Sequence, residues 1–175
     1  MKKRDIIKGW LQANQSYFKE LFERRKIHRS PKHLELGSVY DAVHQNYDPC
    51  FVLSTGRCGT KLLTKILEAH PQISAFHVPV PELTFHNKFA YENQSSKSET
   101  LENMIDVARY EYIRNTFLLE KKFVETNNRC TFFAPQLAKI YPNSKFIHLV
   151  RNPHSVVKSG VSRGWYSGKK VHDES

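Results

Sequence analysis

The chain has 175 residues, of which 39% are apolar and 25% charged, a composition typical of one soluble globular domain. It contains no run of 18 apolar residues, and its first residues do not resemble a secretory signal, so we expect neither a membrane-spanning helix nor export. The three cysteines, Cys50, Cys58 and Cys130, form no CxxC pair. The sequence therefore predicts no metal site and no disulfide framework, and we expect a cytoplasmic protein.

The net charge is +10, from 27 basic and 17 acidic residues, and it is unevenly distributed. Residues 1–33 hold 10 basic and 3 acidic residues and so carry +7. Such an excess favours anionic partners, which include nucleotides, sulfated or phosphorylated substrates, membranes and nucleic acid. Charge alone does not choose among these classes.

The pattern of residues 4–26 predicts an amphipathic helix with one apolar face and one basic face. Apolar side chains recur at helical spacing at Ile6, Ile7, Trp10, Leu11, Tyr17, Phe18, Leu21 and Phe22. Such a helix either docks on its own domain or makes peripheral contact with an anionic membrane surface. Ser30-Pro31 marks its end, and residues 28–47 are expected to be irregular. Residues 1–48 are thus interpreted as a lead-in to a domain over residues 49–175.

From Cys50 onward, short apolar runs alternate with helical patterns. Strands are predicted at 50–54, 72–78, 130–134 and 145–150, helices at 60–69, 100–124, 136–141 and 153–163, and a loop at 93–98. This alternation predicts an α/β fold with a parallel sheet flanked by helices. Ligands bind such sheets beyond the carboxyl ends of the strands, where residues 54–61 and 151–163 are expected.

The loop STGRCGTK at residues 54–61 has the outline of a phosphate site, since it leads from a strand into a helix N-terminus. Gly56 and Gly59 allow close approach of the backbone. Arg57, Thr60 and Lys61 supply charge and a hydroxyl group. The spacing differs from the ATP-binding G-x-x-x-x-G-K-[ST], because Leu62 stands where that loop has its Mg²⁺-binding hydroxyl.

The stretch STGRCGTKLLTKILEAHP resembles the 5′-phosphosulfate loop of sulfotransferases that use 3′-phosphoadenosine-5′-phosphosulfate (PAPS). The resemblance implies PAPS as cofactor, without a metal. It also implies that one end of the cofactor is bound by Arg57, Cys58, Gly59, Thr60 and Lys61.

A second stretch, YPNSKFIHLVRNPHSVVKSGVSRG, resembles the 3′-phosphate site of the same family. In that family an Arg at a strand end and a Ser eight residues later hold the 3′-phosphate, which here implies Arg151 and Ser159. An arginine at a strand end offers phosphate a planar fork of donors. Arg163, one turn after Ser159, adds positive charge.

The resemblance covers roughly residues 49–165 and is nearest to the tyrosyl-protein and carbohydrate branch. It implies a P-loop NTPase-like sulfotransferase fold. Family members continue well beyond the 3′-phosphate helix, whereas this sequence ends at Ser175. We therefore expect an N-terminal fragment in which the C-terminal part of the fold is incomplete, and we expect the activity of this short chain to be uncertain.

The implied reaction moves a sulfuryl group from PAPS to a hydroxyl or amine, and an acceptor hydroxyl requires a base. His77 and Glu82 both follow the second predicted strand, and His77 is slightly favoured because its strand end should face the cleft. Arg57 and the neighbouring amides would stabilise the charge that develops on the leaving oxygen. One family feature is missing, because CTFFAP at residues 130–135 contains no lysine, and Lys61 is the suggested substitute.

Two other functions stay open, a P-loop phosphotransferase and a non-catalytic nucleotide-binding or membrane-associated module. Nucleic acid is not expected as a partner, because zinc-finger spacing and aromatic RNA-binding signatures are absent. The sequence does not identify the acceptor, which the family's range leaves as carbohydrate, lipid, small molecule or protein, and it does not identify the oligomeric state.

Overall fold

The computed structural model describes residues 35–165, so the helix expected at 4–26 lies outside the described residues. The elements are α2 (Leu36–Asn46), β1 (Cys50–Leu53), α3 (Thr60–Glu68), β2 (Ile73–Phe76), α4 (Thr84–Asn93), α5 (Ser98–Leu118), β3 (Lys122–Glu125), the 3₁₀ helix η1 (Asn128–Phe133), α6 (Ala134–Ile140), β4 (Lys145–His148) and α7 (Pro153–Val161). None of the helices in this part of the chain is both long enough and apolar enough to cross a bilayer.

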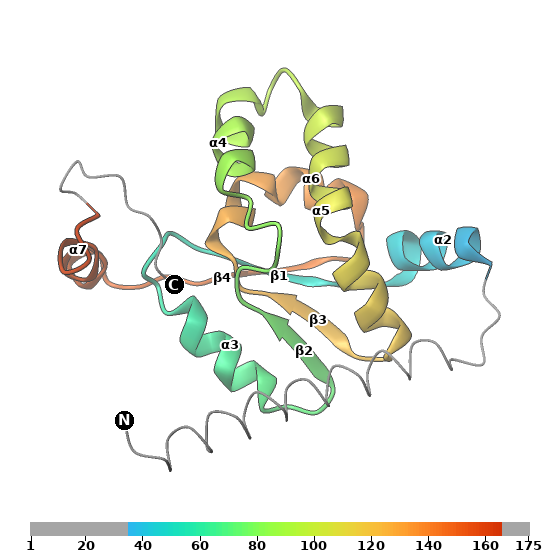
Figure 1. Cartoon of the computed structure of the whole chain (residues 1–175), viewed down its shortest axis with the longest axis horizontal. Helices are drawn as coiled ribbons and strands as arrows, with labels where there is room; N and C mark the ends of the chain where they lie inside the picture. Colours follow the sequence, from blue (N-terminus) through green and yellow to red (C-terminus); the bar gives the residue numbers. More distant parts are fainter. Residues whose placement is uncertain (1–34, 166–175) are drawn as a thin grey trace, which may run out of the picture.

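The four strands form one parallel sheet in the order β2-β3-β1-β4, which confirms the predicted α/β class (Figure 1). In this register Cys50 lies opposite Val124 of β3 and Lys145 of β4. Because all four strands run the same way, the segments that follow them emerge at one edge of the sheet. β4 lies at the end of the sheet and leaves all four of its side chains exposed.

Alternating side chains of the strands build a core on each face of the sheet. On one face Phe51 and Phe123 are fully buried, with their ring centroids 5.9 Å apart, in a core that α5 and α6 complete. On the other face Val52 and Val124 pack against Leu63 and Leu67 of α3. Figure 1 shows the same division, with α5 and α6 on one side of the sheet and α3 on the other.

The strand predicted at 130–134 is wrong. Residues 128–133 form η1, and the third strand is β3, which lies at the end of the predicted helix 100–124. Helix α5 ends at Leu118, and Glu120 follows with φ = 56°. A left-handed residue after a helix is usually glycine, so a glutamate at this position gave no stop signal.

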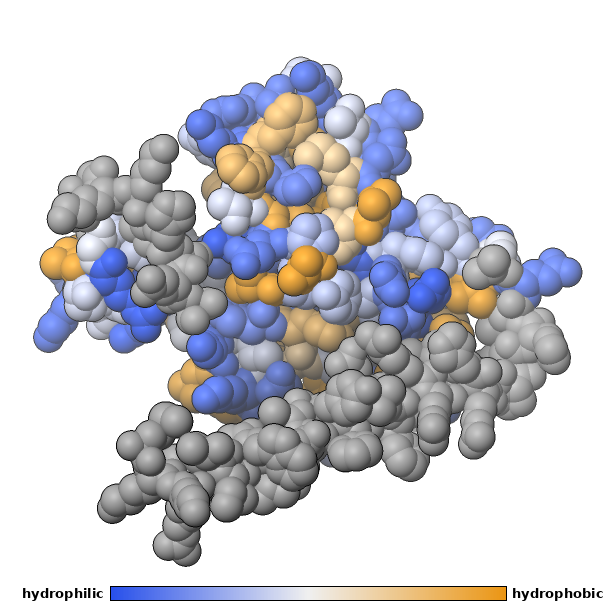
Figure 2. All heavy atoms as spheres, viewed as in Figure 1, coloured by the Kyte–Doolittle hydropathy of each residue, from blue (hydrophilic) through white to orange (hydrophobic). Residues whose placement is uncertain are grey.

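Two helices occur where none was expected. Within the stretch predicted to be irregular, α2 forms because Val39, Val43 and Tyr47 recur every four residues and are buried in the core shared with α5. Helix α4 occupies much of the polar stretch before the loop at 93–98. The surface drawn in Figure 2 is mostly hydrophilic, with apolar side chains gathered in its upper part, where α4 and α5 lie.

We expect Phe123→Ala to lower the free energy of unfolding by about 3–5 kcal/mol, because it removes a fully buried ring from the main core. Val107→Ala on α5 is the matched control, since Val107 is 83% exposed and its truncation should change stability by less than about 0.5 kcal/mol. Urea unfolding of the two variants measures the difference. Equal losses would contradict the assignment of this core.

Candidate functional site

A pocket of about 660 Å³ opens at the edge of the sheet where the strands end. Its lining is drawn from the segments that follow all four strands: Gly56, Arg57, Gly59, Thr60, Lys61, Thr64, Lys65 and Glu68 after β1, His77, Val78 and Glu82 after β2, Asn128 and Arg129 after β3, and Arg151, Arg163 and Trp165 after β4. The pocket is therefore a product of the parallel topology, as the sequence predicted for residues 54–61 and 151–163.

The charge of the pocket is strongly positive. Six cationic side chains line it, namely Arg57, Lys61, Lys65, Arg129, Arg151 and Arg163, against two carboxylates, Glu68 and Glu82. A concave site lined by one sign of charge concentrates ligands of the opposite sign. The site is therefore suited to a ligand that carries several negative charges.

The loop after β1 presents backbone amides at one end of the pocket. Gly59 is the N-cap of α3 and has φ = 98°, a left-handed conformation that glycine adopts without steric cost. The space beside its Cα is open, with no atom within 4 Å of where a Cβ would stand. The first amides of α3 have no helical acceptor and carry partial positive charge, which suits a phosphate or phosphosulfate group.

Trp165 lies against the start of the same loop. A Cβ at Gly56 would lie 2.5 Å from Cη2 of Trp165, so the ring lies close to the loop backbone. The guanidinium of Arg57 lies 5.6 Å from the centroid of this ring, within the range of a cation–π contact. Trp165 is not among the residues predicted from the sequence, and no motif around it marks its role.

The two predicted binding segments are joined by hydrogen bonds. Nε of Arg57 donates to Oγ of Ser159 at 3.0 Å, although the two residues are 102 positions apart. Nη1 of Arg151 donates to the carbonyl oxygen of Arg57 at 3.0 Å. The structure thus brings Arg57, Arg151 and Ser159 together. Arg57, Arg151 and Arg163 line the pocket, whereas Ser159 is not among the lining residues.

Cys58 is placed differently from its neighbours in the loop. Its thiol lies 3.1 Å from Oγ1 of Thr55 and 3.9 Å from the carbonyl oxygen of Gly56, and the residue is not among those that line the pocket. A role for Cys58 in binding would therefore rest on its backbone amide.

His77 lies at the pocket wall in a network of hydroxyl groups. Its Nδ1 is 3.3 Å from Oγ1 of Thr126, which in turn is 2.6 Å from Oγ1 of Thr64 on α3. Partial burial lowers the pKa of His77, and the nearby positive charges of Lys61 and Arg129 lower it further. A neutral imidazole can accept a proton, which fits the predicted role of a base.

Glu82 also lines the pocket and forms an ion pair with Arg129, which is not among the residues predicted from the sequence. Nη1 of Arg129 donates to Oε2 of Glu82 at 3.2 Å and to its carbonyl oxygen at 3.3 Å. The family's lysine is expected close to the third strand, which the sequence predicts at 130–134. The third strand of the structure is β3, and the segment that follows it, residues 126–129, brings the cation of Arg129 into the pocket.

Comparisons with known proteins indicate one family. The model of the sulfotransferase family matches residues 49–173. A protein of Caenorhabditis briggsae with the provisional name protein-tyrosine sulfotransferase is 26% identical over 119 residues. This match covers 65% of the chain and 42% of the relative, so the chain spans less than half the length of the relative it matches. No solved structure matches the chain significantly.

The lowered pKa of His77 predicts a pH-dependent loss of stability. Its folded-state pKa lies below the ordinary value of 6.5, so the unfolded chain takes up the proton first as the pH falls. Stability is therefore fully retained above about pH 6.5, falls as the pH drops below that value, and levels off below the folded-state pKa. Urea unfolding between about pH 8 and pH 5 should show a larger loss in the wild type than in His77→Gln. The same loss in both would contradict a lowered pKa at His77.

Proposed function

The chain belongs to the sulfotransferase family, and on this premise we propose that it moves a sulfuryl group from PAPS to a hydroxyl or amine acceptor. The observation that carries the proposal is the contact between the two predicted cofactor segments through Arg57, Ser159 and Arg151. It supports a single ligand with an anionic group at each end, which is the character of PAPS.

The residues of the pocket fit the two ends of this cofactor. We propose that the amides of residues 58–61, with Arg57 and Lys61, hold the 5′-phosphosulfate. We propose that Arg151, Ser159 and Arg163 hold the 3′-phosphate. Arginine offers phosphate paired donors in a fixed plane, and charge-assisted hydrogen bonds of this kind are among the strongest in proteins.

The proposed chemistry needs a base on one side and positive charge on the other. When bound, PAPS would supply an activated sulfuryl group, which would leave the 5′-phosphate oxygen for the acceptor oxygen or nitrogen while the base takes the acceptor's proton. Arg57 and the amides at the start of α3 would stabilise the charge left on the phosphate oxygen. In this pocket cationic side chains of the protein would stabilise that charge, and no metal ion is proposed.

His77 is the stronger of the two candidates for the base. Its lowered pKa keeps the imidazole neutral near pH 7, and its contact with Thr126 holds the ring in place. The carboxylate of Glu82 is engaged by Arg129, although 57% of its side chain remains exposed to the pocket mouth and solvent. Glu82 therefore stays the second candidate.

The choice of the first acceptor to test rests on the relative and not on the pocket. The name of the Caenorhabditis briggsae relative makes a protein tyrosine the first acceptor to test, ahead of carbohydrates, lipids and small molecules. A cytoplasmic location, with peripheral membrane contact through residues 4–26, is proposed on the sequence alone.

Calorimetric titration with 3′-phosphoadenosine 5′-phosphate tests the donor site. We expect binding by the wild type, and Arg151→Ala should weaken it about 10–100-fold, because one set of charge-assisted hydrogen bonds is lost. Arg114→Ala is the matched control, since this arginine lies on α5 and contacts Asn115 and Glu111. Unchanged affinity in Arg151→Ala, or equally tight binding of ATP with Mg²⁺, would overturn the proposed donor.

Substitution of the two base candidates separates their roles. If His77 is the base, His77→Gln should lower kcat by about 10²–10⁴-fold with a tyrosine peptide as acceptor, while the affinity for the bisphosphate is kept. Glu82→Gln, at the same pocket wall, should lower kcat much less. The reverse order would assign the base to Glu82, and full activity in both variants would exclude both residues.

A further inference from the structure

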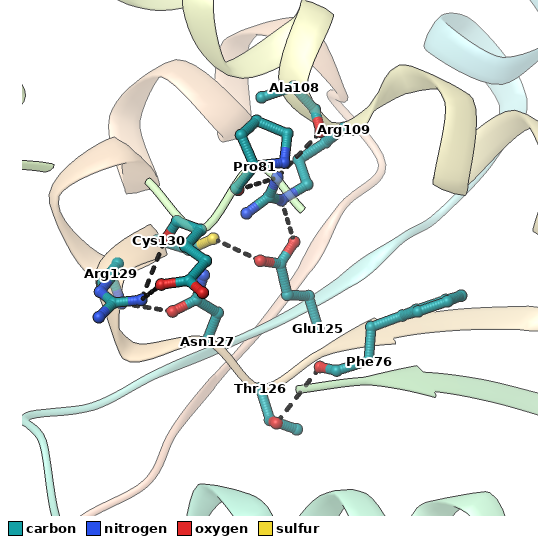
Figure 3. Close-up of polar contacts among 10 residues, drawn as sticks. Phe76, Pro81, Ala108, Arg109, Glu125, Thr126, Asn127, Arg129 and Cys130 are labelled. Carbon is teal, nitrogen blue, oxygen red and sulfur yellow. Dashed lines mark hydrogen bonds and ion pairs between the residues drawn. The ribbon is translucent and has the colours of Figure 1, made fainter. Parts of the chain in front are cut away.

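A fully buried ion pair lies behind the pocket, between α5 and the end of β3 (Figure 3). Nε of Arg109 donates to Oε2 of Glu125 at 2.7 Å, and both side chains are 0% exposed. The thiol of Cys130 donates to the other carboxylate oxygen at 3.1 Å. Burial raises the pKa of this thiol, so it remains protonated and able to donate.

Arg109 also reaches the loop that carries the base candidates. Its Nη1 donates at 3.0 Å to the carbonyl oxygen of Pro81, the residue directly before Glu82, and at 2.9 Å to the carbonyl of Ala108. Figure 3 shows the guanidinium between Pro81 and Glu125. One planar group thus joins the loop to the end of β3 across the core.

This loop has a strained backbone at both ends. Val78 has φ = 53° and Leu83 has φ = 65°, conformations that residues other than glycine rarely adopt, and β-branched residues least of all. Such strain persists only where surrounding contacts hold the backbone. Leu83 is 1% exposed and anchors one end of the loop, and Arg109 holds its centre.

Glu125 continues the connection into the turn after β3, which also lines the pocket. The next residue, Thr126, contacts His77, and Oδ1 of Asn127 accepts a hydrogen bond from the backbone N–H of Arg129 at 3.1 Å. The ion pair therefore lies between the two segments that place His77, Glu82 and Arg129.

From this geometry we propose that Arg109 is a positioning residue, which sets the loop at residues 77–83 against the turn at residues 126–129 so that the base and Arg129 face the same point in the pocket. The role in turnover rests on the proposed sulfuryl transfer. The positioning of the loop is a property of the structure and can be tested separately.

The test variant is Arg109→Met combined with Glu125→Met, which removes both charges together. Replacing a buried ion pair by apolar residues of similar size is often tolerated, whereas removing one partner leaves an unpaired charge. We expect hydrogen exchange, followed by mass spectrometry, to become about tenfold faster or more in peptides over 77–85, while peptides over α3 keep their protection. The affinity for 3′-phosphoadenosine 5′-phosphate should be unchanged, and kcat with a tyrosine peptide should fall by about 10–100-fold.

Two further variants distinguish a local loosening of the loop from a general loss of stability. Arg109→Lys keeps the charge, but a single ammonium group cannot reproduce the fork toward both Pro81 and Glu125, so it should show the same local change to a smaller extent. Ile105→Ala, one turn earlier on the same helix and fully buried, should destabilise the fold without selective exchange at 77–85.

Unchanged exchange at 77–85 in both Arg109 variants would overturn the proposal, as would an equal increase along the whole chain. Full kcat despite a loosened loop would also overturn it. If the wild type bound no bisphosphate and transferred no sulfuryl group, the proposed function would fail. Selective exchange at 77–85 would then still support the positioning of this loop by Arg109.

Discussion

The ion pair between Arg109 and Glu125 is the contact on which the arrangement behind the pocket depends. Two charges at zero exposure carry a large desolvation cost, and this cost is offset only when the geometry is close and the remaining donors and acceptors are used. Here Nε of Arg109 and Oε2 of Glu125 are 2.7 Å apart, Cys130 bonds the second carboxylate oxygen, and Pro81 and Ala108 accept from Nη1, while the buried Nη2 has no hydrogen-bond partner among the described residues. These partners can meet only if α5, β3 and the loop after β2 take the observed positions.

The parallel sheet supplies the second constraint. All four strands point their carboxyl ends to one edge, so four loops from distant parts of the sequence share one pocket. The pocket is lined by four more cationic than anionic side chains, and their mutual repulsion would be unfavourable without an anionic partner nearby. The hydrogen bonds of Arg57 to Ser159 and of Arg151 to the Arg57 carbonyl reduce the freedom of these cations and orient them toward the same space.

The hydroxyl network beside His77 connects these two constraints. Thr126 follows Glu125 directly, and its hydroxyl lies between His77 and Thr64, whose own hydroxyl donates to the carbonyl oxygen of Thr60 at the start of α3. This network of short side chains thus links the end of β3 to α3 beside the pocket. Partial burial at this place, together with the positive charges of Lys61 and Arg129, lowers the pKa of His77.

The local features of this protein could be read from its sequence. The loop at 54–61, the helix after Arg151 and the spacing of Arg151 and Ser159 depend on contacts between near neighbours, and the structure has them on the predicted elements. The third strand is not predicted, because Glu120, the left-handed residue that follows α5, gives no glycine stop signal. Helix α2 is not predicted either, although Val39, Tyr40 and Val43 follow helical spacing.

The sequence by itself therefore determined the α/β class, the resemblance to sulfotransferases and most residues that line the pocket. Only the tertiary structure decided that Arg109 and Glu125 are buried, that Arg129 enters the pocket and that Trp165 lies against Gly56. The physical reason is that a charged residue in a helical pattern looks the same whether it is solvated or buried. Its environment is set by partners far away in the chain, and the sequence carries no local sign of them.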